Sequence, residues 1–403
     1  MGERLEGMTG GVLDGVRVVD FGRYIAGPWC AALLGDFGAD VIRVEKVGGG
    51  EDRHICRISA EDGSGAMYLQ VNRNKRCLTL DPTVHSGREV QKRLLATADI
   101  VVANMPQRAL KKLGLDYRSL RRVRPDAILV SNTCFGATGP YEGRLGFDGL
   151  AQAMCGNMHL TGTPNEPMKS FAPWVDFGTA SLCALGAVLA LVARQKTGQG
   201  QEVQGTLLAT ALTTASPSLI EQAVNAPNRI ATGNRGQLNA PSDVFETQDG
   251  HIMVLVTGAP MFERWAKLLG EPHWLEDGRF RTDDSRGDHA EIFSARMADW
   301  CASRTTEQAL AELEHARVPA GPVHTPQQAL DDPQVARGGF METVGYPGAP
   351  ADPPMVTTPV RLLATPGGIR RRAPLLGEHN DEILAELGYS RSEITQLGDE
   401  GAI

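Results

Sequence analysis

The first half of the chain alternates short β-rich apolar runs with longer segments of helical periodicity. The apolar runs occupy residues 16–21, 40–45, 76–80, 100–103 and 127–130, and helices are predicted at residues 28–37 and 87–96. A strand, a helix and a second strand in succession form a βαβ unit, whose strands pair in parallel through a right-handed crossover. The repeated alternation therefore predicts an open parallel α/β sheet.

The pattern changes after residue 224. Two strand-like runs at residues 244–247 and 251–256 flank Asp249 and Gly250, which predict a hairpin because both turn positions tolerate positive φ. Helical periodicity follows at residues 261–269, 292–302 and 306–316. A stretch rich in proline and glycine at residues 345–359 predicts a linker, and residues 374–397 are again helical.

A chain of 403 residues is longer than one hydrophobic core usually supports, so we expect two domains. The predicted boundaries give a large α/β domain at residues 1–224 and a small α+β domain at residues 225–333. Residues 334–403 are expected to form a linker and a C-terminal segment that returns to the large domain. The expected fold class is α/β, with a Rossmann-like open parallel sheet in the large domain.

Composition and charge narrow the range of partners. With 42% apolar and 22% charged residues, the sequence is typical of a soluble globular protein. The formal net charge of -8 and the pI near 5.7 argue against a nucleic-acid binder, which normally presents a basic face. The 7 cysteines lie far apart without metal-binding spacing, so we expect reduced thiols and no bound metal.

Two segments bear on location. Residues 1–11 are polar and rich in glycine, and they lack the apolar core of a signal peptide. The apolar run at residues 177–193 is shorter than a usual membrane span and includes Thr179 and Ser181, so we expect a buried helix. The sequence thus predicts a cytoplasmic protein that does not engage a membrane.

Common nucleotide-binding and hydrolase motifs are missing from the sequence. The turn at residues 22–28 lacks the G-x-G-x-x-G spacing of a dinucleotide site, and the glycines at residues 48–50 do not lead into a P-loop. The chain has neither the G-x-S-x-G elbow of a serine hydrolase nor the H-E-x-x-H pair of a zinc hydrolase. These observations disfavour a dehydrogenase, an NTPase and both hydrolase classes.

Asp176 is the candidate for chemistry. It stands at the start of the most apolar predicted helix, which is typical of an N-cap whose carboxylate accepts backbone N–H bonds. A carboxylate held at a buried helix end can also act as a covalent nucleophile towards an activated acyl group. Periodicity does not decide between these two roles.

Several short motifs, taken in their order along the chain, resemble the class III CoA-transferases, which include formyl-CoA and carnitine CoA-transferases. The resemblance extends over residues 13–403. The motifs are Leu-Asp-Gly-Val-Arg-Val-Val-Asp at residues 13–20, Ala-Gly-Pro at 26–28, Phe-Gly-Ala-Asp-Val-Ile at 37–42, Asn-Arg-Asn-Lys-Arg at 72–76, Phe-Gly-Ala-Thr-Gly-Pro-Tyr at 135–141, Lys-Thr-Gly-Gln-Gly-Gln at 196–201 and Pro-Leu-Leu-Gly-Glu-His at 374–379.

By this resemblance, the family's catalytic aspartate falls on Asp176. The resemblance implies that Asp176 attacks the thioester of an acyl-CoA to give a mixed anhydride, and that the CoA thiolate then forms an aspartyl-CoA thioester. A small carboxylic acid reverses the two steps as acceptor. The expected enzyme therefore moves CoA from an acyl-CoA to a carboxylic acid, with CoA as part of its substrates and no permanently bound cofactor. The family also implies an interlocked homodimer.

The resemblance further implies a set of contacts to CoA. They fall on Ile25, Ala26, Lys46, Leu80, Asp81, Asn104, Met105, Lys112 and Thr133. Lys46 and Lys112 suit the CoA phosphates as point charges rather than as bidentate forks.

Two departures from related patterns limit the chemistry. Formyl-CoA transferases carry a glycine-rich loop over the active site, whereas residues 233–237 here contain only two glycines, so oxalate/formate exchange is not supported. Acyl-CoA racemases need a base on both faces of the α-carbon, and their His-Asp pair corresponds to Phe147 and Asp148 here. An α-methylacyl-CoA racemase or epimerase is thus the disfavoured alternative enzyme, and a CoA-binding protein without turnover is the alternative from another class.

Overall fold

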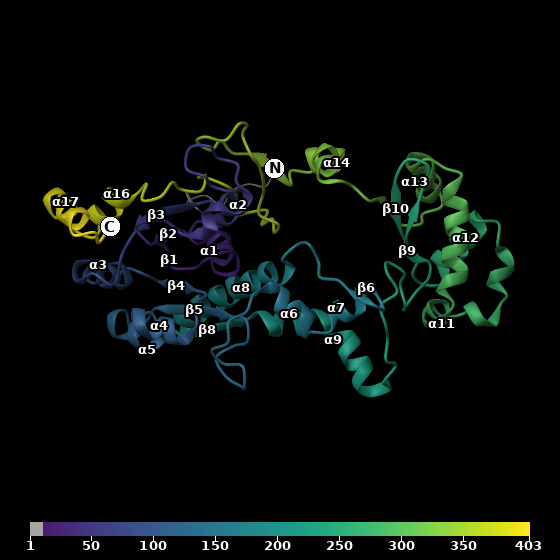
Figure 1. Ribbon diagram of the computed structural model, residues 1–403, viewed down its shortest axis with the longest axis horizontal. Coiled ribbons are helices and arrows are strands. Elements are labelled where there is room, and N and C mark those ends of the chain that lie inside the picture. Colours follow the sequence, from purple (N-terminus) through teal and green to yellow (C-terminus); the bar gives the residue numbers. More distant parts are fainter. Residues whose placement is uncertain (1–10) are drawn as a thin grey trace. The chain divides into compact units, whose positions relative to one another are not determined.

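The computed structural model describes residues 11–403, which form two compact units (Figure 1). The first unit comprises the described residues up to Cys155, together with Ser170–Ser216 and Pro333–Ile403. The second unit comprises Gly156–Lys169 and Pro217–Asp332. The division between the units falls within helix α9 (Leu207–Asn225), eight residues before the boundary expected from the sequence, and residues 156–169 of the expected large domain belong to the second unit.

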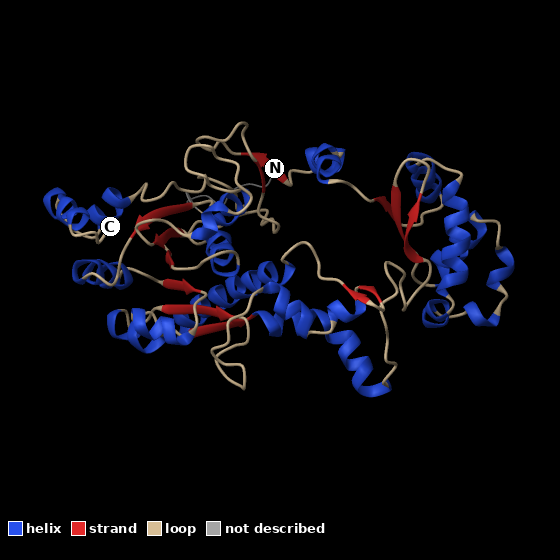
Figure 2. Cartoon of the chain, in the orientation of Figure 1, coloured by secondary structure: helices blue, strands red, loops and turns tan. Residues whose placement is uncertain are grey.

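A six-stranded parallel sheet forms the centre of the first unit (Figure 2). Its order is β3 (Lys75–Thr79), β2 (Asp40–Glu45), β1 (Arg17–Asp20), β4 (Ile100–Ala103), β5 (Ile128–Thr133) and β8 (Glu202–Thr206). The predicted parallel α/β core is confirmed, and β8 is a strand that the hydrophobic pattern did not predict. The strand order reverses direction between β1 and β4, which makes the carboxyl ends of these two strands the expected place for a ligand.

Helices cover both faces of this sheet because successive side chains of a strand point to opposite sides. Val18 and Val102 pack against α1 (Ala26–Asp36) and α8 (Trp174–Thr197) on one face. Val19 and Val101 face the other side, against α3 (His85–Ala96) and α5 (Tyr117–Val123). Because these strands are buried on both faces, nearly all of their residues are apolar, which explains the continuous apolar runs in the first half of the sequence.

The expected buried helix is α8, and it is buried on one side only. Ala180 and Ala187 pack in the core, whereas Leu182, Leu185 and Leu189 are 52%, 55% and 59% exposed. By length and composition, α8 is the one helix of the described residues that could cross a membrane. The exposed leucines are spaced three and four residues apart, so they form one apolar stripe along the helix.

The Asn-Arg-Asn-Lys-Arg run at residues 72–76 supplies buried ion pairs. Arg73 contacts Asp36 at 2.6 Å, and the Lys75 ammonium contacts Asp20 at 2.7 Å, with no exposed side-chain surface in either pair. Burial lowers the pKa of Lys75 to about 8, against the opposing effect of Asp20. The Lys75 pair holds the carboxyl end of β1, from which the next turn starts, and the Arg73 pair holds the last residue of α1.

The C-terminal segment differs from its prediction in two places. The expected linker at residues 345–359 contains β13 (Pro354–Val356), which pairs with β12 (Met341–Thr343) in an antiparallel ladder. The helical pattern at residues 374–397 forms two helices, α16 (Asn380–Glu386) and α17 (Arg391–Asp399). They are separated because Gly388 adopts a positive φ of 84° and Ser390 caps α17.

The second unit contains the predicted hairpin. Strands β9 (Ser242–Glu246) and β10 (His251–Leu255) pair antiparallel, and β11 (Ala320–Pro322) adds to β10. Helices α10 (Ala259–Leu268), α12 (Ala290–Ala302) and α13 (Thr306–His315) pack on them around an aromatic core.

The remaining elements of the described residues are short. They are η1 (Glu51–His54), α2 (Ala66–Asn72), α4 (Gln107–Leu113), α6 (Asp148–Met154), α7 (Asn157–Leu160), β6 (Gly162–Thr163), β7 (Glu166–Pro167), η2 (Pro272–Leu275), η3 (Gly278–Phe280), α11 (Asp283–Asp288), α14 (Pro326–Asp331) and α15 (Pro333–Arg337).

Candidate active site

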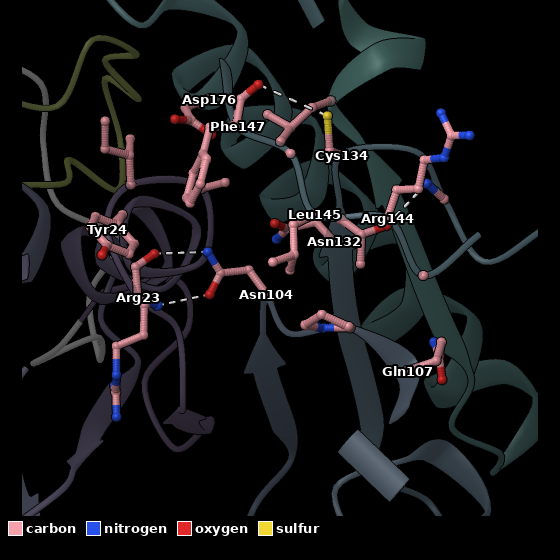
Figure 3. Close-up of a pocket in the computed structure, with 18 of the residues that line it drawn as sticks. Arg23, Tyr24, Asn104, Gln107, Asn132, Cys134, Arg144, Leu145, Phe147 and Asp176 are labelled. Atoms are coloured by element: carbon pink, nitrogen blue, oxygen red, sulfur yellow. Dashed lines mark hydrogen bonds between the residues drawn. The ribbon is translucent and has the colours of Figure 1, made fainter. Parts of the chain in front are cut away.

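A cavity of about 200 Å³ lies at the carboxyl ends of β1, β4 and β5, where the strand order reverses (Figure 3). Its walls come from separate parts of the first unit. They are residues 23–26 after β1, residues 104, 106 and 107 after β4, residues 132–134 at the end of β5, Gly136, residues 142–147, Asp176 and Leu207. Short loops on a rigid sheet therefore shape the cavity.

The turn after β1 is held by an asparagine from the neighbouring strand. Asn104 Oδ1 accepts from the Arg23 backbone N–H at 2.7 Å, and Asn104 Nδ2 donates to the Arg23 carbonyl at 2.7 Å (Figure 3). Tyr24 follows with φ of 60°, a conformation that non-glycine residues adopt only when the surroundings enforce it. Its backbone N–H donates to Asp52 Oδ2 at 3.3 Å. The turn is therefore fixed before any ligand binds.

Asp176 lies in the first turn of α8, and another carboxylate caps this helix. Asp148 Oδ2, from α6, accepts from the backbone N–H groups of Val175 at 2.8 Å and of Asp176 at 3.1 Å. Gln152 Nε2 donates to the other oxygen of Asp148. The N-cap interpretation of Asp176 is therefore wrong, because Asp148 satisfies these backbone donors and leaves the Asp176 carboxylate facing the cavity.

The surroundings make Asp176 an unusually basic carboxylate. Burial, and secondly the charge of Asp148, raise the pKa of Asp176 from 3.8 to about 7. The Cys134 thiol lines the same cavity, and burial, followed by the charges of Asp176 and Asp148, raises its pKa to about 11. At neutral pH this thiol stays protonated, whereas a large part of Asp176 is ionised and can attack a carbonyl carbon.

Aromatic rings cover one side of the cavity. Phe147 contacts Tyr24 edge to face, with ring centroids 5.9 Å apart, and both residues line the cavity together with Asp176. Phe147 occupies the position at which the racemase pattern requires a histidine. A phenyl ring cannot exchange a proton, so the cavity has an apolar wall there instead of a second base.

The structure brings together some of the residues expected at the site. Ile25, Ala26, Asn104 and Thr133 line the cavity with Asp176. The other expected CoA contacts lie outside this lining. Lys46 is exposed and paired with Glu51 at 2.6 Å, and Lys112 is exposed on α4. Leu80 and Met105 pack in the core on the face of the sheet that α3 and α5 cover. The Asp81 carboxylate accepts hydrogen bonds from Thr83.

Sequence reasoning missed several residues of the lining. Tyr24, Asn132 and Cys134 each stand beside a predicted contact, so adjacency to Ile25 and Thr133 was the available signal. Asp148 was noted only as part of a dipeptide, because its role as a helix cap depends on a residue 28 positions away. Within residues 11–403, no group of three or more histidine, cysteine, aspartate or glutamate side chains is placed to hold a metal ion.

Comparisons with known proteins agree over nearly the whole chain. The family model for CoA-transferase family III matches residues 13–380. The chain is 33% identical to succinyl-CoA–D-citramalate CoA-transferase of Chloroflexus aurantiacus over 96% of each chain. It is 34% identical to succinate–glutarate CoA-transferase of Agrobacterium fabrum, over 93% of this chain and 95% of the relative. The crystal structure of a CAIB/BAIF family protein from Brucella suis matches with a TM-score of 0.82 and 33% identity, over 94% of this chain and 100% of that one.

Proposed function

The chain belongs to CoA-transferase family III and is an acyl-CoA:carboxylate CoA-transferase, and we propose that the transfer proceeds through the carboxylate of Asp176. The observation that carries this proposal is a half-buried carboxylate with a pKa of about 7 in the lining of a cavity at the reversal point of the sheet. The Cys134 thiol is a further nucleophile in this lining, and its raised pKa disfavours it.

The proposed reaction has four nucleophilic steps that need no net proton transfer. An Asp176 oxygen attacks the thioester carbon of the donor, the C–S bond breaks, and CoA leaves as a thiolate from a mixed anhydride. The thiolate attacks the Asp176 carbonyl and displaces the donor carboxylate, which leaves an aspartyl-CoA thioester. The acceptor carboxylate then displaces the thiolate, and the thiolate attacks the acceptor acyl carbon of the second anhydride, which regenerates Asp176. The apolar wall of Tyr24 and Phe147 suits these water-sensitive intermediates.

We further propose that the exchanged acids are short dicarboxylic acids, with succinyl-CoA as a donor. The support is the sequence similarity of this chain to two relatives, whose names specify succinyl-CoA or succinate paired with citramalate or glutarate. These acids share two carboxyl groups on a short carbon chain. A panel of CoA donors and carboxylate acceptors, followed by mass spectrometry, would test this substrate class, and exchange restricted to monocarboxylic acids would contradict it.

The CoA moiety is proposed to run from the cavity along the carboxyl edge of the sheet. Ile25, Ala26, Asn104 and Thr133 would surround the thioester end. The remaining proposed contacts are Lys46, Leu80, Asp81, Met105 and Lys112. Lys112 is exposed without an ion pair in the described residues and can meet a phosphate directly, whereas Lys46 must exchange Glu51 for it.

We also propose that the protein works in the cytoplasm as a homodimer in which the apolar stripe of α8 meets a second copy. The stripe exposes Leu182, Leu185 and Leu189, and such a contiguous apolar face is unusual on a monomer. Replacing Leu185 by aspartate should shift the mass measured by light scattering from dimer towards monomer. An unchanged dimer would contradict this placement of the contact.

Trapping of the covalent intermediate tests the role of Asp176. The protein is incubated with succinyl-CoA and no acceptor, treated with borohydride or hydroxylamine, and digested for peptide mass spectrometry. The wild type should carry the modification at Asp176, and Asp176→Ala should carry none and lose CoA exchange. Glu142→Gln is the matched control, because Glu142 is the other carboxylate in the cavity lining and lies on an exposed loop. Full exchange by Asp176→Ala would refute the proposal.

A racemase is the alternative within enzymes, and the Phe147 wall argues against it. Exchange of the α-proton with deuterated water, measured by NMR on a branched acyl-CoA, separates the two reactions. A CoA-binding protein without turnover would bind acyl-CoA but give no label in the trapping experiment.

A further inference from the structure

Asn132 carries an unsatisfied hydrogen-bond donor in the wall of the cavity. It is the fifth residue of β5 and is 2% exposed. Its Nδ2 atom is buried and has no acceptor in hydrogen-bonding geometry within the described residues. Figure 3 shows its side chain among those that line the cavity that contains Asp176. Among the unsatisfied buried side-chain atoms of residues 11–403, this is the one that belongs to a cavity-lining residue.

A buried amide without partners is costly, so its presence needs a reason. The neighbouring polar side chains of the same region do not share the defect. Asn104 uses both ends of its amide on Arg23, and Ser131 donates to Glu202 Oε1 at 3.0 Å. The unsatisfied donor is therefore particular to Asn132 and is not a general feature of this edge of the sheet.

The side chain of Cys183 is the candidate hydrogen-bond partner of Asn132 among the described residues. Burial raises the pKa of Cys183 to about 11, and a side-chain hydrogen bond from the Asn132 amide to the ionised sulfur opposes this rise in part. The thiol is therefore protonated at neutral pH, and a protonated thiol is a weak acceptor. A carbonyl oxygen of a ligand is a stronger acceptor than this thiol and would compete with it for the N–H2 group.

We propose that Asn132 is a binding residue for the acyl-CoA arm, and that its N–H2 group donates to a carbonyl oxygen of that arm. This inference rests on the proposed function, because it takes acyl-CoA as the occupant of the cavity. The arm offers the thioester carbonyl and the two amide carbonyls of pantetheine, all of which accept N–H donors. An acceptor bound in the cavity satisfies this N–H2 group. Because the amide is already desolvated in the free enzyme, no further desolvation of it opposes substrate binding.

The two carbonyl sources predict different kinetic effects. A donor to the thioester carbonyl strengthens as the oxygen gains negative charge during attack by Asp176, so its loss lowers kcat. A donor to a pantetheine amide holds substrate and product CoA equally, so its loss raises KM and weakens the binding of free CoA.

The test replaces Asn132 by leucine, which has a similar volume but no donor, and by aspartate, which keeps the shape of the amide. Folding is checked by circular dichroism and thermal unfolding. Measurements are CoA exchange with succinyl-CoA as donor and calorimetric binding of free CoA. Ser131→Ala is the matched control on the same strand, and Cys183→Ala removes the thiol without touching the amide.

Both Asn132 variants should lose roughly tenfold or more in kcat/KM, whereas both controls should stay within about twofold of the wild type. A loss confined to kcat assigns the thioester carbonyl, and a matching loss of free CoA binding assigns a pantetheine amide. Wild-type kinetics and binding in a folded Asn132→Leu or Asn132→Asp would overturn the inference, and so would an equal loss in Cys183→Ala. Asp176→Ala is assayed in parallel: if it is inactive while Asn132→Leu is normal, only the Asn132 inference fails, and if it is active the proposed function fails.

Discussion

Replacing Asp148 by asparagine should move the acidic limb of the pH–rate profile to lower pH. Asp148 contacts the first turn of α8 through Oδ2, and an amide oxygen can accept the same bonds from Val175 and Asp176, whereas the amide nitrogen replaces the oxygen that accepts from Gln152 Nε2. The substitution removes the negative charge beside Asp176 and leaves the burial of its carboxyl group unchanged. It therefore isolates the smaller of the two causes that raise the pKa of Asp176.

The magnitude follows from the structure. The pKa of Asp176 rises from 3.8 to about 7, and Asp148 is the second cause after burial, so it accounts for less than half of this rise. We expect the pKa to fall by about 1 and by no more than about 1.5. Because only the carboxylate attacks, a drop from about 7 to about 6 raises the ratio of rates at pH 5.5 and pH 8 roughly sevenfold.

The assay is the rate of covalent labelling by succinyl-CoA in single turnover, measured from pH 5 to pH 8.5. This half-reaction reports the ionisation of Asp176 without contributions from the acceptor acid. Glu142→Gln serves as the control, and its acidic limb should coincide with that of the wild type. An acidic limb of Asp148→Asn that stays at the wild-type pH, or moves to higher pH, would refute the electrostatic reasoning.

Three further substitutions have defined outcomes. Asp176→Asn should stabilise the fold at pH 8 by about 1–3 kcal/mol in denaturant unfolding, since a carboxyl group with a raised pKa destabilises the folded state progressively as pH rises from 3.8 to about 7. The difference should vanish below pH 3.8, and a pH-independent difference would contradict this origin. Phe147→Ala should increase hydrolysis of succinyl-CoA relative to transfer several-fold, because it opens the cavity to water, whereas Phe171→Ala, fully exposed and outside the lining, should not. Lys75→Met should cost about 3–5 kcal/mol in free energy of unfolding because it leaves buried Asp20 unpaired. The exposed pair of Lys267 with Glu263 provides the comparison: Lys267→Met should cost less than about 0.5 kcal/mol, and equal losses for the two lysines would argue against this account.

Local pattern was sufficient for the large features of the first unit. Strands buried on both faces must be apolar at nearly every position, so β2 and β4 were predicted with their observed bounds. The hairpin of β9 and β10 was also predicted, although Asp249 and Gly250 do not adopt the positive φ on which that prediction rested and the strands are joined through residues 247–250. Strand β8 was missed since its residues are mixed in polarity, and only its place beside β5 makes it a strand.

The candidate site was less accessible to sequence reasoning. Asp176 could be singled out from its place before the apolar helix and from its resemblance to a family motif. Its local position favoured a cap, however, and only the fold brings Asp148 onto the same helix end and takes over that role. The pKa of Asp176 depends on this contact and on burial, neither of which is a property of the neighbouring sequence.

The sequence by itself therefore determined the parallel sheet, the hairpin and the family, because these depend on periodicity, turn residues and the order of short motifs. Tertiary structure decided which residues face the cavity, which side of α8 stays exposed, and which carboxylate caps and which reacts. The physical reason is that desolvation, charge proximity and unsatisfied donors such as that of Asn132 arise between segments distant in the chain. They exist only once β1, β4, β5 and α8 meet at one edge of the sheet.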